Sequence, residues 1–181
     1  MDKDQFADEL LSSISHTIIA HSKYPKTPDD AIRYWDNITP YAIHPIWCAI
    51  TLLTETGLPE KIRYDGYLAL LWHDILEDTN LPLPENTRKD VQKLVQDMTF
   101  ESFSDERERI YSCSETIKLL KLYDKVSILL DAIWMSDSKW NQLVEYTLEL
   151  CDFVLRKYGE LNIVKIANAV CKLRNKIDES A

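Results

Sequence analysis

Glycine is scarce in this sequence: only three of its 181 residues are glycine, at positions 57, 66 and 159. The phosphate-binding loops of many nucleotide-binding proteins need several closely spaced glycines, because a side chain would keep the backbone N–H groups away from the phosphate. The sequence therefore excludes both the Walker loop and the dinucleotide-binding fingerprint. Any bound phosphate must be held in another way.

Three further absences narrow the class of protein. The four cysteines, at positions 48, 113, 151 and 171, are widely spaced without a CxxC pair, which predicts reduced thiols and a cytoplasmic location. No apolar run reaches the ~18 residues that a membrane helix needs, and the acidic start MDKDQFADEL is not a signal peptide. The net charge is −9 and no long basic stretch is present, so we expect no nucleic-acid partner.

Helical spacing dominates the patterning that is present. Apolar residues make up 45% of the chain and recur three or four positions apart, whereas sustained alternation and Asn-Gly or Asp-Gly hairpin signals are missing. We therefore expect an all-α fold, a bundle of seven or eight helices in a single domain over residues 1–181. Its core is expected at 16–135, with C-terminal helices at 137–178.

Local signals place the ends of the expected helices. These helices cover residues 4–21, 31–35, 39–57, 63–77, 88–98, 112–135, 137–158 and 161–177. Thr39 before a proline indicates a helix start, and Gly57 and Gly159 indicate helix ends. Thr87 and Ser112 are each followed three residues later by an acidic residue, the spacing of a capping box. The charged segment between the fifth and sixth helices predicts a mobile loop or a short helix.

The segment LALLWHDILEDTN, residues 68–80, combines an apolar helix with four polar side chains: His73, Asp74, Glu77 and Asp78. Spacings of three and four residues bring these side chains together on one helical face. A buried carboxylate without a partner costs several kcal/mol, and three of them would also repel each other. A divalent cation removes both penalties. The alternative is an exposed helix end with ordinary solvated charges.

Two residues elsewhere favour the cation. Asp124 lies on an apolar stripe of its predicted helix, although an ion pair with Lys121 or Lys125 is also within reach. His44 begins another apolar helix, where a lone histidine is more often a packed or capping residue than a ligand. Together the candidates offer two imidazoles and two carboxylates, a set that suits a divalent metal with open water positions. They are His44, His73, Asp74 and Asp124.

In order and spacing, four segments resemble the HD-domain metal-dependent phosphohydrolases, and among them the small stand-alone SpoT-type (p)ppGpp hydrolases. The segments are YAIHPIWCA at 41–49, LLWHDILEDT at 70–79, VQDMT at 95–99 and KLYDK at 121–125. The specific part is the HD-x-x-ED pattern, because a bare HD dipeptide is common. The resemblance covers about residues 16–131 and implies an HD-type helical fold.

The resemblance also implies roles for the candidate residues. It implies that His44, His73, Asp74 and Asp124 bind the metal and that the ion is manganese. It implies that Glu77 and Asp78 act on the attacking water, and Glu77 is the preferred general base. The family reaction splits a 3′-pyrophosphate from a guanosine nucleotide, so the expected partner is a small nucleotide substrate.

Basic side chains near these segments are candidate substrate ligands. They are Lys23, Lys26, Arg33, Arg107, Lys121 and Lys125. Each of them has the alternative of an ordinary solvated charge or a surface ion pair.

Three positions depart from the family pattern. Ile128 stands where the family has an asparagine that faces the ribose, Tyr123 replaces an alanine, and Asp97 replaces a glycine. These changes leave the metal ligands complete but alter the expected nucleoside pocket. Hydrolysis of (p)ppGpp therefore stands beside two alternatives. One is a phosphatase acting on another nucleotide, either 5′-nucleotidase-like or acting on NADPH, and the other is a non-catalytic nucleotide-binding module.

Overall fold

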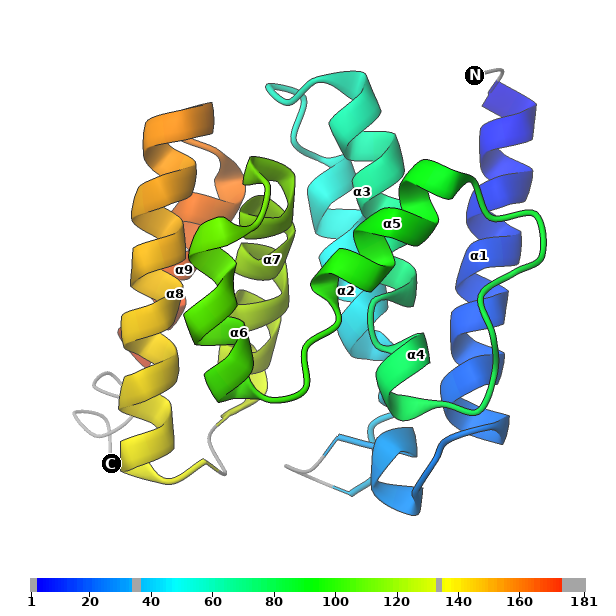
Figure 1. The fold of residues 1–181 in the computed structure, drawn as a ribbon, viewed down its shortest axis with the longest axis horizontal. Coiled ribbons are helices and arrows are strands. Elements are labelled where there is room, and N and C mark those ends of the chain that lie inside the picture. Colours follow the sequence, from blue (N-terminus) through cyan, green and yellow to red (C-terminus); the bar gives the residue numbers. More distant parts are fainter. Residues whose placement is uncertain (1–2, 34–36, 133–134, 174–181) are drawn as a thin grey trace.

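The structure is a computed structural model that describes residues 3–33, 37–132 and 135–173, and within them the fold is all α (Figure 1). The helices are α1 (Lys3–Lys23), α2 (Ile43–Leu53), α3 (Glu60–Trp72), α4 (Ile75–Asp78), α5 (Lys89–Met98), α6 (Phe103–Arg109), α7 (Glu115–Asp131), α8 (Asp137–Tyr158) and α9 (Asn162–Val170). Two 3₁₀ helices cover Pro28–Ala31 and Ile110–Ser112. In the described part of the chain, β pairing is limited to two isolated bridges. The predicted all-α class is confirmed.

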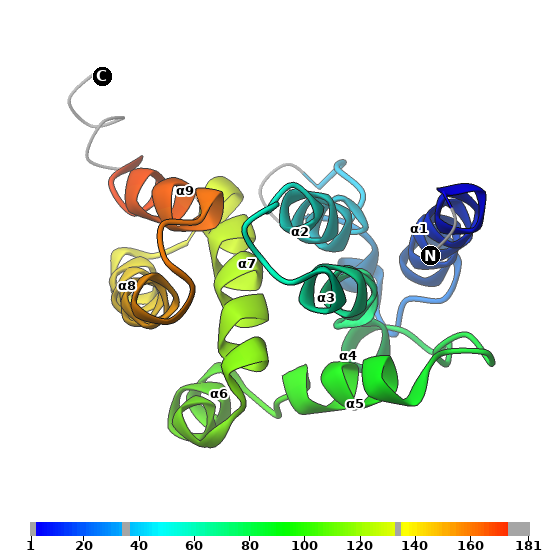
Figure 2. The same cartoon turned by 90° about the horizontal axis from the view of Figure 1, so that it is seen from above.

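The long helices stand in a row that runs from α1 through α2, α3 and α7 to α8 and α9 (Figure 2). Helices α5 and α6 lie on one side of this row, in front of α3 and α7 respectively (Figures 1 and 2). One continuous apolar core fills the space between the helices. No helix in the described ranges has the length and apolar character needed to cross a bilayer.

Helix α3 is buried on every side in its second half, where all residues from Asp65 to Trp72 are buried. Such a helix has little amphipathic character because both of its faces contact other helices. α7 is comparable, since eleven of its side chains are buried, among them the charged residues Lys121, Asp124 and Lys125. These two helices therefore form the interior of the row. They also carry polar residues that were predicted to lie on apolar helices.

The helix predicted over 63–77 is interrupted at its polar end. α3 stops at Trp72, His73 caps it, and Asp74 starts the single turn of α4. The Asp74 carbonyl accepts the N–H groups of Glu77 and Asp78 at 3.1 and 2.8 Å. The expectation that His73 and Glu77 share one continuous helical face is therefore wrong, because the chain turns between them.

The predicted limits of the second long helix, 39–57, are also wrong at both ends. α2 begins at Ile43 because Pro40 pairs with Ile32 in an isolated bridge and the chain turns before the helix. It ends at Leu53 with Thr54 as C-cap, so Gly57 lies beyond the helix. Gly159 does end α8, with a left-handed φ of 82° that favours glycine.

Two predicted capping boxes do not form. The Thr87 hydroxyl donates to the Pro84 carbonyl at 2.6 Å, and Arg88 occupies the N-cap of α5. The cap of α7 is Ser114, whose Oγ accepts the N–H of Ile117 at 3.3 Å, rather than Ser112. In both cases the hydroxyl of the expected cap donates to a carbonyl three residues earlier, since Ser112 Oγ likewise donates to the Arg109 carbonyl at 2.7 Å.

Other elements differ in length from their predictions. The charged segment after α5 forms α6 and a 3₁₀ turn, which agrees with the predicted short helix and not with the predicted mobile loop. The helix predicted at 31–35 is a 3₁₀ turn at Pro28–Ala31, and residues 34–36 lie outside the described part. The final helix ends at Val170, and residues 174–177 of the predicted helix lie outside the described part of the chain.

A buried carboxylate connects the end of α2 to α7 and α9. Glu55 is 3% exposed and accepts the backbone N–H groups of Asn162 and Ile163 at 3.1 and 2.9 Å. Its Oε1 also accepts the hydroxyl of Tyr123 at 3.2 Å. A carboxylate at the start of α9 is favourable because the free N–H groups there carry partial positive charge. The large side chain at position 123 thus has a buried partner, which braces the turn of α7 next to Asp124.

We expect Gly66→Ala to lower the free energy of unfolding by about 1–3 kcal/mol, because the added Cβ overpacks the core. That Cβ would lie 2.7 Å from Leu52 Cδ2 and 3.0 Å from Leu120 Cδ2. Gly57→Ala is the matched control, since its Cβ would meet only Leu161 at 4.0 Å. Urea unfolding of both variants tests this, and equal losses in the two would contradict the packing account.

Candidate metal centre

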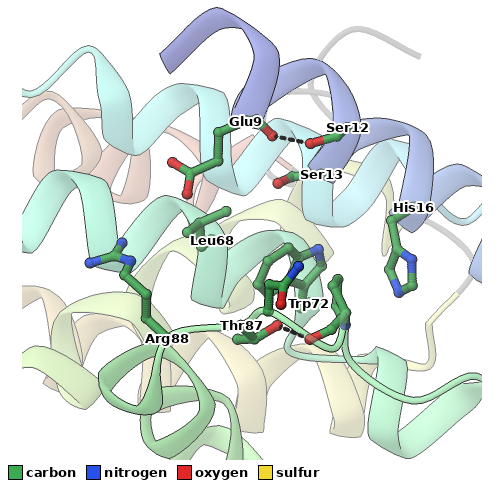
Figure 3. Close-up of a pocket in the computed structure, with 10 residues that line it drawn as sticks. Glu9, Ser12, Ser13, His16, Leu68, Trp72, Thr87 and Arg88 are labelled. Atoms are coloured by element: carbon green, nitrogen blue, oxygen red, sulfur yellow. Dashed lines mark hydrogen bonds between the residues drawn. The ribbon is translucent and has the colours of Figure 1, made fainter. Parts of the chain in front are cut away.

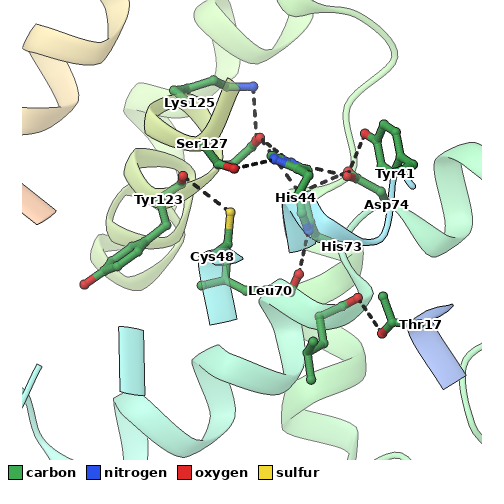
Figure 4. Close-up of polar contacts among 12 residues, drawn as sticks. Thr17, Tyr41, His44, Cys48, Leu70, His73, Asp74, Tyr123, Lys125 and Ser127 are labelled. Carbon is green, nitrogen blue, oxygen red and sulfur yellow. Dashed lines mark hydrogen bonds and ion pairs between the residues drawn. The ribbon is translucent and has the colours of Figure 1, made fainter. Parts of the chain in front are cut away.

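Two histidines and two aspartates meet where the start of α2, the α3–α4 junction and the middle of α7 come together. Figure 4 shows three of them, His44, His73 and Asp74. His44 Nε2 lies 3.5 Å from Asp74 Oδ2 and 3.4 Å from Asp124 Oδ1. His73 Nε2 lies 3.1 Å from Asp74 Oδ1 and 3.8 Å from Asp124 Oδ1. All four side chains are buried. The structure therefore gathers the four candidate ligands, which are far apart in the sequence, into one cluster.

The two imidazoles are oriented as metal ligands are. His73 Nδ1 donates to the Leu70 carbonyl at 2.8 Å, and His44 Nδ1 lies 2.9 Å from Ser127 Oγ. Both Nε2 atoms are left facing the carboxylates, and His73 Nε2 is buried without a hydrogen-bond partner. A buried polar atom of that kind needs an explanation, and a metal ion provides one.

The spacing of the donor atoms fits a single ion. One ligand atom each from His44, His73 and Asp124 can be chosen so that all lie within 4.8 Å of one another. Ions of this class bind such nitrogen and oxygen atoms at about 2.0–2.2 Å, so the atoms need only small shifts to share one ion. Asp74 contacts both imidazoles and is available as the fourth ligand. The chemistry and geometry of these residues therefore fit a divalent metal.

Asp124 uses its two oxygens differently. Oδ1 faces the imidazoles, whereas Oδ2 accepts from the ammonium groups of Lys121 and Lys125, each at 3.1 Å. Burial alone would raise the pKa of Asp124, but the two ammonium groups hold it well below its usual range. The two sequence alternatives for Asp124, an ion pair with a lysine and a place in the cluster, are therefore both realised.

Tyr41 orients the other aspartate and was given no role from the sequence. Its hydroxyl donates to Asp74 Oδ2 at 2.9 Å, and the buried ring of His21 stacks on it with 4.8 Å between ring centres. The only sequence signal for Tyr41 was its position three residues before His44 within the matching segment. Ser127 was missed in the same way, because nothing local indicates that its hydroxyl reaches His44.

Glu77 and Asp78 project from α4 into a pocket of about 260 Å³ that His44, Asp74 and Asp124 also line. Burial, followed by the neighbouring charge of Asp74, raises the pKa of Glu77 above its usual range. The same two causes raise the pKa of Asp78 to about 7. Glu77 Oε1 accepts the backbone N–H of Phe100 at 3.3 Å, which fixes the side chain. Carboxylates with raised pKa values are suited to accept or return protons near neutral pH.

The six candidate substrate ligands are distributed unevenly. Lys121 and Lys125 line the pocket. Arg33 instead makes a two-pronged pair with Asp131 at 2.7 and 2.8 Å, and Arg107 pairs with Glu145 on α8 at 3.3 Å. Lys26 donates to the carbonyls of Leu76 and Glu77 at the end of α4, at 2.9 and 2.6 Å. Lys23 is exposed and, like these last three residues, does not line the pocket.

A separate cavity of about 320 Å³ lies between α1, α3 and the segment before α5 (Figure 3). Glu9, Ser13, His16, Trp72 and Arg88 are among the residues that line it. It shares no residue with the pocket over the metal ligands, although Trp72 directly precedes His73. None of the sequence-predicted site residues lines it, so the candidate site is the pocket on α4 and α7.

Comparison with known proteins connects this geometry to a group of hydrolases. No family model matches the chain. A protein of Xenopus tropicalis described as guanosine-3′,5′-bis(diphosphate) 3′-pyrophosphohydrolase MESH1 is 32% identical over 114 residues, which cover 58% of this chain and 62% of that protein. The match thus spans about three fifths of that relative.

A solved structure extends the likeness to nearly the whole fold. It is described as "A metazoan ortholog of SpoT hydrolyzes ppGpp and plays a role in starvation responses". The two folds agree with a TM-score of 0.65 over 91% of this chain and 94% of that chain, at 22% identity. The chain is thus similar to SpoT-type hydrolases in part of its sequence and in its fold. The resemblance inferred from the four sequence segments is confirmed.

The three departures from the SpoT-type pattern lie at different distances from the centre. Ile128 lines the pocket and places an apolar side chain there. Tyr123 points away from it to Glu55, and Asp97 pairs with Lys93 at 2.9 Å. Among these SpoT-type departures, only Ile128 therefore changes the surface that a substrate meets.

We expect Asp74→Ala to lose the metal, because it removes one of the two carboxylates that contact both imidazoles. Metal content after equilibration with Mn²⁺ should fall from about one ion per chain to near zero, and added Mn²⁺ should no longer raise the melting temperature. In the unchanged protein, Mn²⁺ at 100 times its Kd should add about 2.7 kcal/mol of stability. Asp90→Ala removes an exposed carboxylate and serves as the control. Full metal content in Asp74→Ala would remove Asp74 from the ligand set.

Proposed function

We propose that this protein is a metal-dependent phosphohydrolase of the cytoplasm that removes the 3′-pyrophosphate of a guanosine nucleotide such as (p)ppGpp, with manganese as its ion. The observation that carries the proposal is the common pocket of about 260 Å³, which three of the four ligand side chains share with Glu77 and Asp78. A module that only binds nucleotides has no need of water-activating carboxylates at such a centre. The described activity of the Xenopus tropicalis relative supports the choice of substrate.

His44, His73, Asp74 and Asp124 would hold the ion. When bound, a divalent ion supplies Lewis acidity toward a phosphoryl oxygen and lowers the pKa of water. The Tyr41 hydroxyl and the Leu70 carbonyl keep Asp74 and His73 in their ligand orientations. This support matters because small displacements of a catalytic group reduce the rate strongly.

Glu77 is assigned as the general base. Its pKa is raised by burial, so it binds the water's proton more strongly than an ordinary glutamate would. The Phe100 N–H donates to Oε1 and so fixes this side chain in the lining of the pocket. Asp78, with its pKa raised to about 7, can hold a proton at neutral pH and return it to the departing oxygen. The two carboxylates thus divide the proton transfers between them.

A second candidate is a phosphatase acting on another nucleotide. Ile128 joins the metal pocket to a neighbouring cavity of about 380 Å³, which Phe103, Met135 and Leu143 also line. This surface is largely apolar where the SpoT-type pattern has an asparagine for the ribose. A nucleoside bound there would be recognised by contact with apolar side chains more than by hydrogen bonds.

A nucleotide panel with Mn²⁺ separates these candidates. We expect release of pyrophosphate from ppGpp at a higher kcat/KM than release of phosphate from 5′-nucleotides or NADPH. Faster turnover of NADPH or of a 5′-nucleotide would favour the second candidate. Metal-loaded protein that turns over none of them would favour the non-catalytic module.

We expect Glu77→Ala to keep the metal and lose turnover, because Glu77 is not in the ligand cluster but lies at the pocket. Loss of a general base ordinarily lowers kcat by about 10²–10⁴-fold. Metal content and kcat are measured on the same sample, with Glu85→Ala as the exposed carboxylate control. Unchanged kcat in Glu77→Ala would show that another group takes the proton.

A further inference from the structure

Two buried lysines face a buried glutamate beside the metal centre. Lys121 and Lys125 are 4% and 6% exposed, and Glu106 of α6 is 4% exposed. Glu106 Oε2 lies 3.2 Å from Lys121 Nζ and 2.9 Å from Lys125 Nζ. The same two ammonium groups each contact Asp124 Oδ2 at 3.1 Å. Four charged groups therefore form one closed, neutral cluster.

The cluster is neutral only while Glu106 takes part. Two ammonium charges are balanced by Asp124 on one side and Glu106 on the other. Buried ammonium groups without counter-charges are unfavourable, so an anion is required at the position of Glu106. Each ammonium also has three N–H donors, of which Asp124 and Glu106 take two. The lysines can therefore hold an oxyanion with more acceptor oxygens than one carboxylate supplies.

The Glu106 carboxylate occupies a place that a substrate phosphate would need. Glu106, Lys121 and Lys125 all line the pocket of about 260 Å³ that Asp124 and Glu77 also line. A phosphoryl group that reached the metal ligands would be within the same small space as both ammonium groups. A carboxylate and a phosphate are both anionic oxygen acceptors for lysine, so each can replace the other.

We propose that Lys121 and Lys125 form the subsite for the pyrophosphate group of the substrate, and that Glu106 fills this subsite as a built-in anion until a phosphate displaces it. The identity of the natural ligand of this subsite rests on the proposed function. Its ability to exchange a carboxylate for an inorganic anion does not depend on turnover. After the reaction, the return of Glu106 to the lysines would favour departure of the anionic product.

Glu106 has a second position available to it. Its Oε1 and the hydroxyl of Tyr146 on α8 are both buried and lack a hydrogen-bond partner. Tyr146 is close enough that, after burial, the Glu106 carboxylate is the next cause that raises the pKa of its hydroxyl. A rotation of the Glu106 side chain toward Tyr146 would satisfy both groups. The contact of Arg107 with Glu145 would hold α6 in place meanwhile.

Titration with inorganic phosphate tests the subsite, with binding followed by calorimetry on metal-free and on Mn²⁺-loaded protein. We expect Glu106→Gln to bind phosphate about tenfold more tightly than the unchanged protein in both states, because the competing anion is gone. Glu108→Gln removes the same charge from the exposed side of α6 and should change affinity less than twofold. Equal affinities in Glu106→Gln and the unchanged protein would overturn the proposal, as would an equal gain in Glu108→Gln.

Three more variants separate displacement from a general charge effect. Glu106→Asp keeps the negative charge but, with a shorter side chain, draws it back from the lysines, so this variant should also bind phosphate more tightly. It tests the subsite even if Glu106→Gln does not fold. Tyr146→Phe removes the second position and should weaken phosphate binding about threefold. In the Glu106→Gln/Lys125→Met double variant the gain should disappear. If Glu106→Asp binds phosphate more tightly but the unchanged protein turns over no nucleotide of the panel, the subsite stands and the proposed hydrolase function is rejected. If the unchanged protein turns over nucleotides but Glu106→Asp has unchanged phosphate affinity, the hydrolase function stands and the subsite is rejected.

Discussion

Asp124 is the residue on which the arrangement of charges in this protein depends. One of its oxygens faces two imidazoles and the other accepts from two buried ammonium groups. It thereby joins the proposed metal centre to the proposed anion subsite. Because the interior is a poor solvent for charge, neither half is stable alone. The apolar face of α7 is where these opposing requirements are met.

The fold keeps this residue in place through contacts that lie well outside the pocket. Glu55 ties the turn of α7 at Tyr123 to the start of α9, directly beside Asp124. On the other side, the interruption after Trp72 lets His73 cap α3 while Asp74 begins α4. The chain thus presents the candidate ligands at the ends and in the middle of helices, and the two carboxylates proposed for proton transfer on a short turn beside them. Such a division suits a site where the metal geometry must be constant and substrate must enter and leave.

The four candidate ligands could be named from the sequence because buried carboxylates and imidazoles on apolar helices are costly without a shared partner. The helical class followed from spacing alone, and the HD-x-x-ED pattern indicated the SpoT-type relationship. Tyr41, Ser127 and Glu106 could not be recognised in this way. Their roles come from contacts that span 33 positions of sequence for Tyr41, 83 for Ser127, and 15 and 19 for Glu106, and no local pattern marks such contacts. Helix ends were the least predictable feature, since several neighbouring residues were equally good caps.

The amino-acid sequence by itself determined that the chain is helical, that acidic and imidazole groups lie on its apolar faces, and that these groups occur in the order typical of SpoT-type hydrolases. Only the tertiary structure decided which charges neutralise one another. It brought Lys121 and Lys125 into the pocket and turned Arg33, Lys26 and Arg107 away from it. The physical reason is that burial is a property of the packed chain. A charge has to be paired only where other helices exclude water, and no residue's own neighbours in sequence reveal where that is.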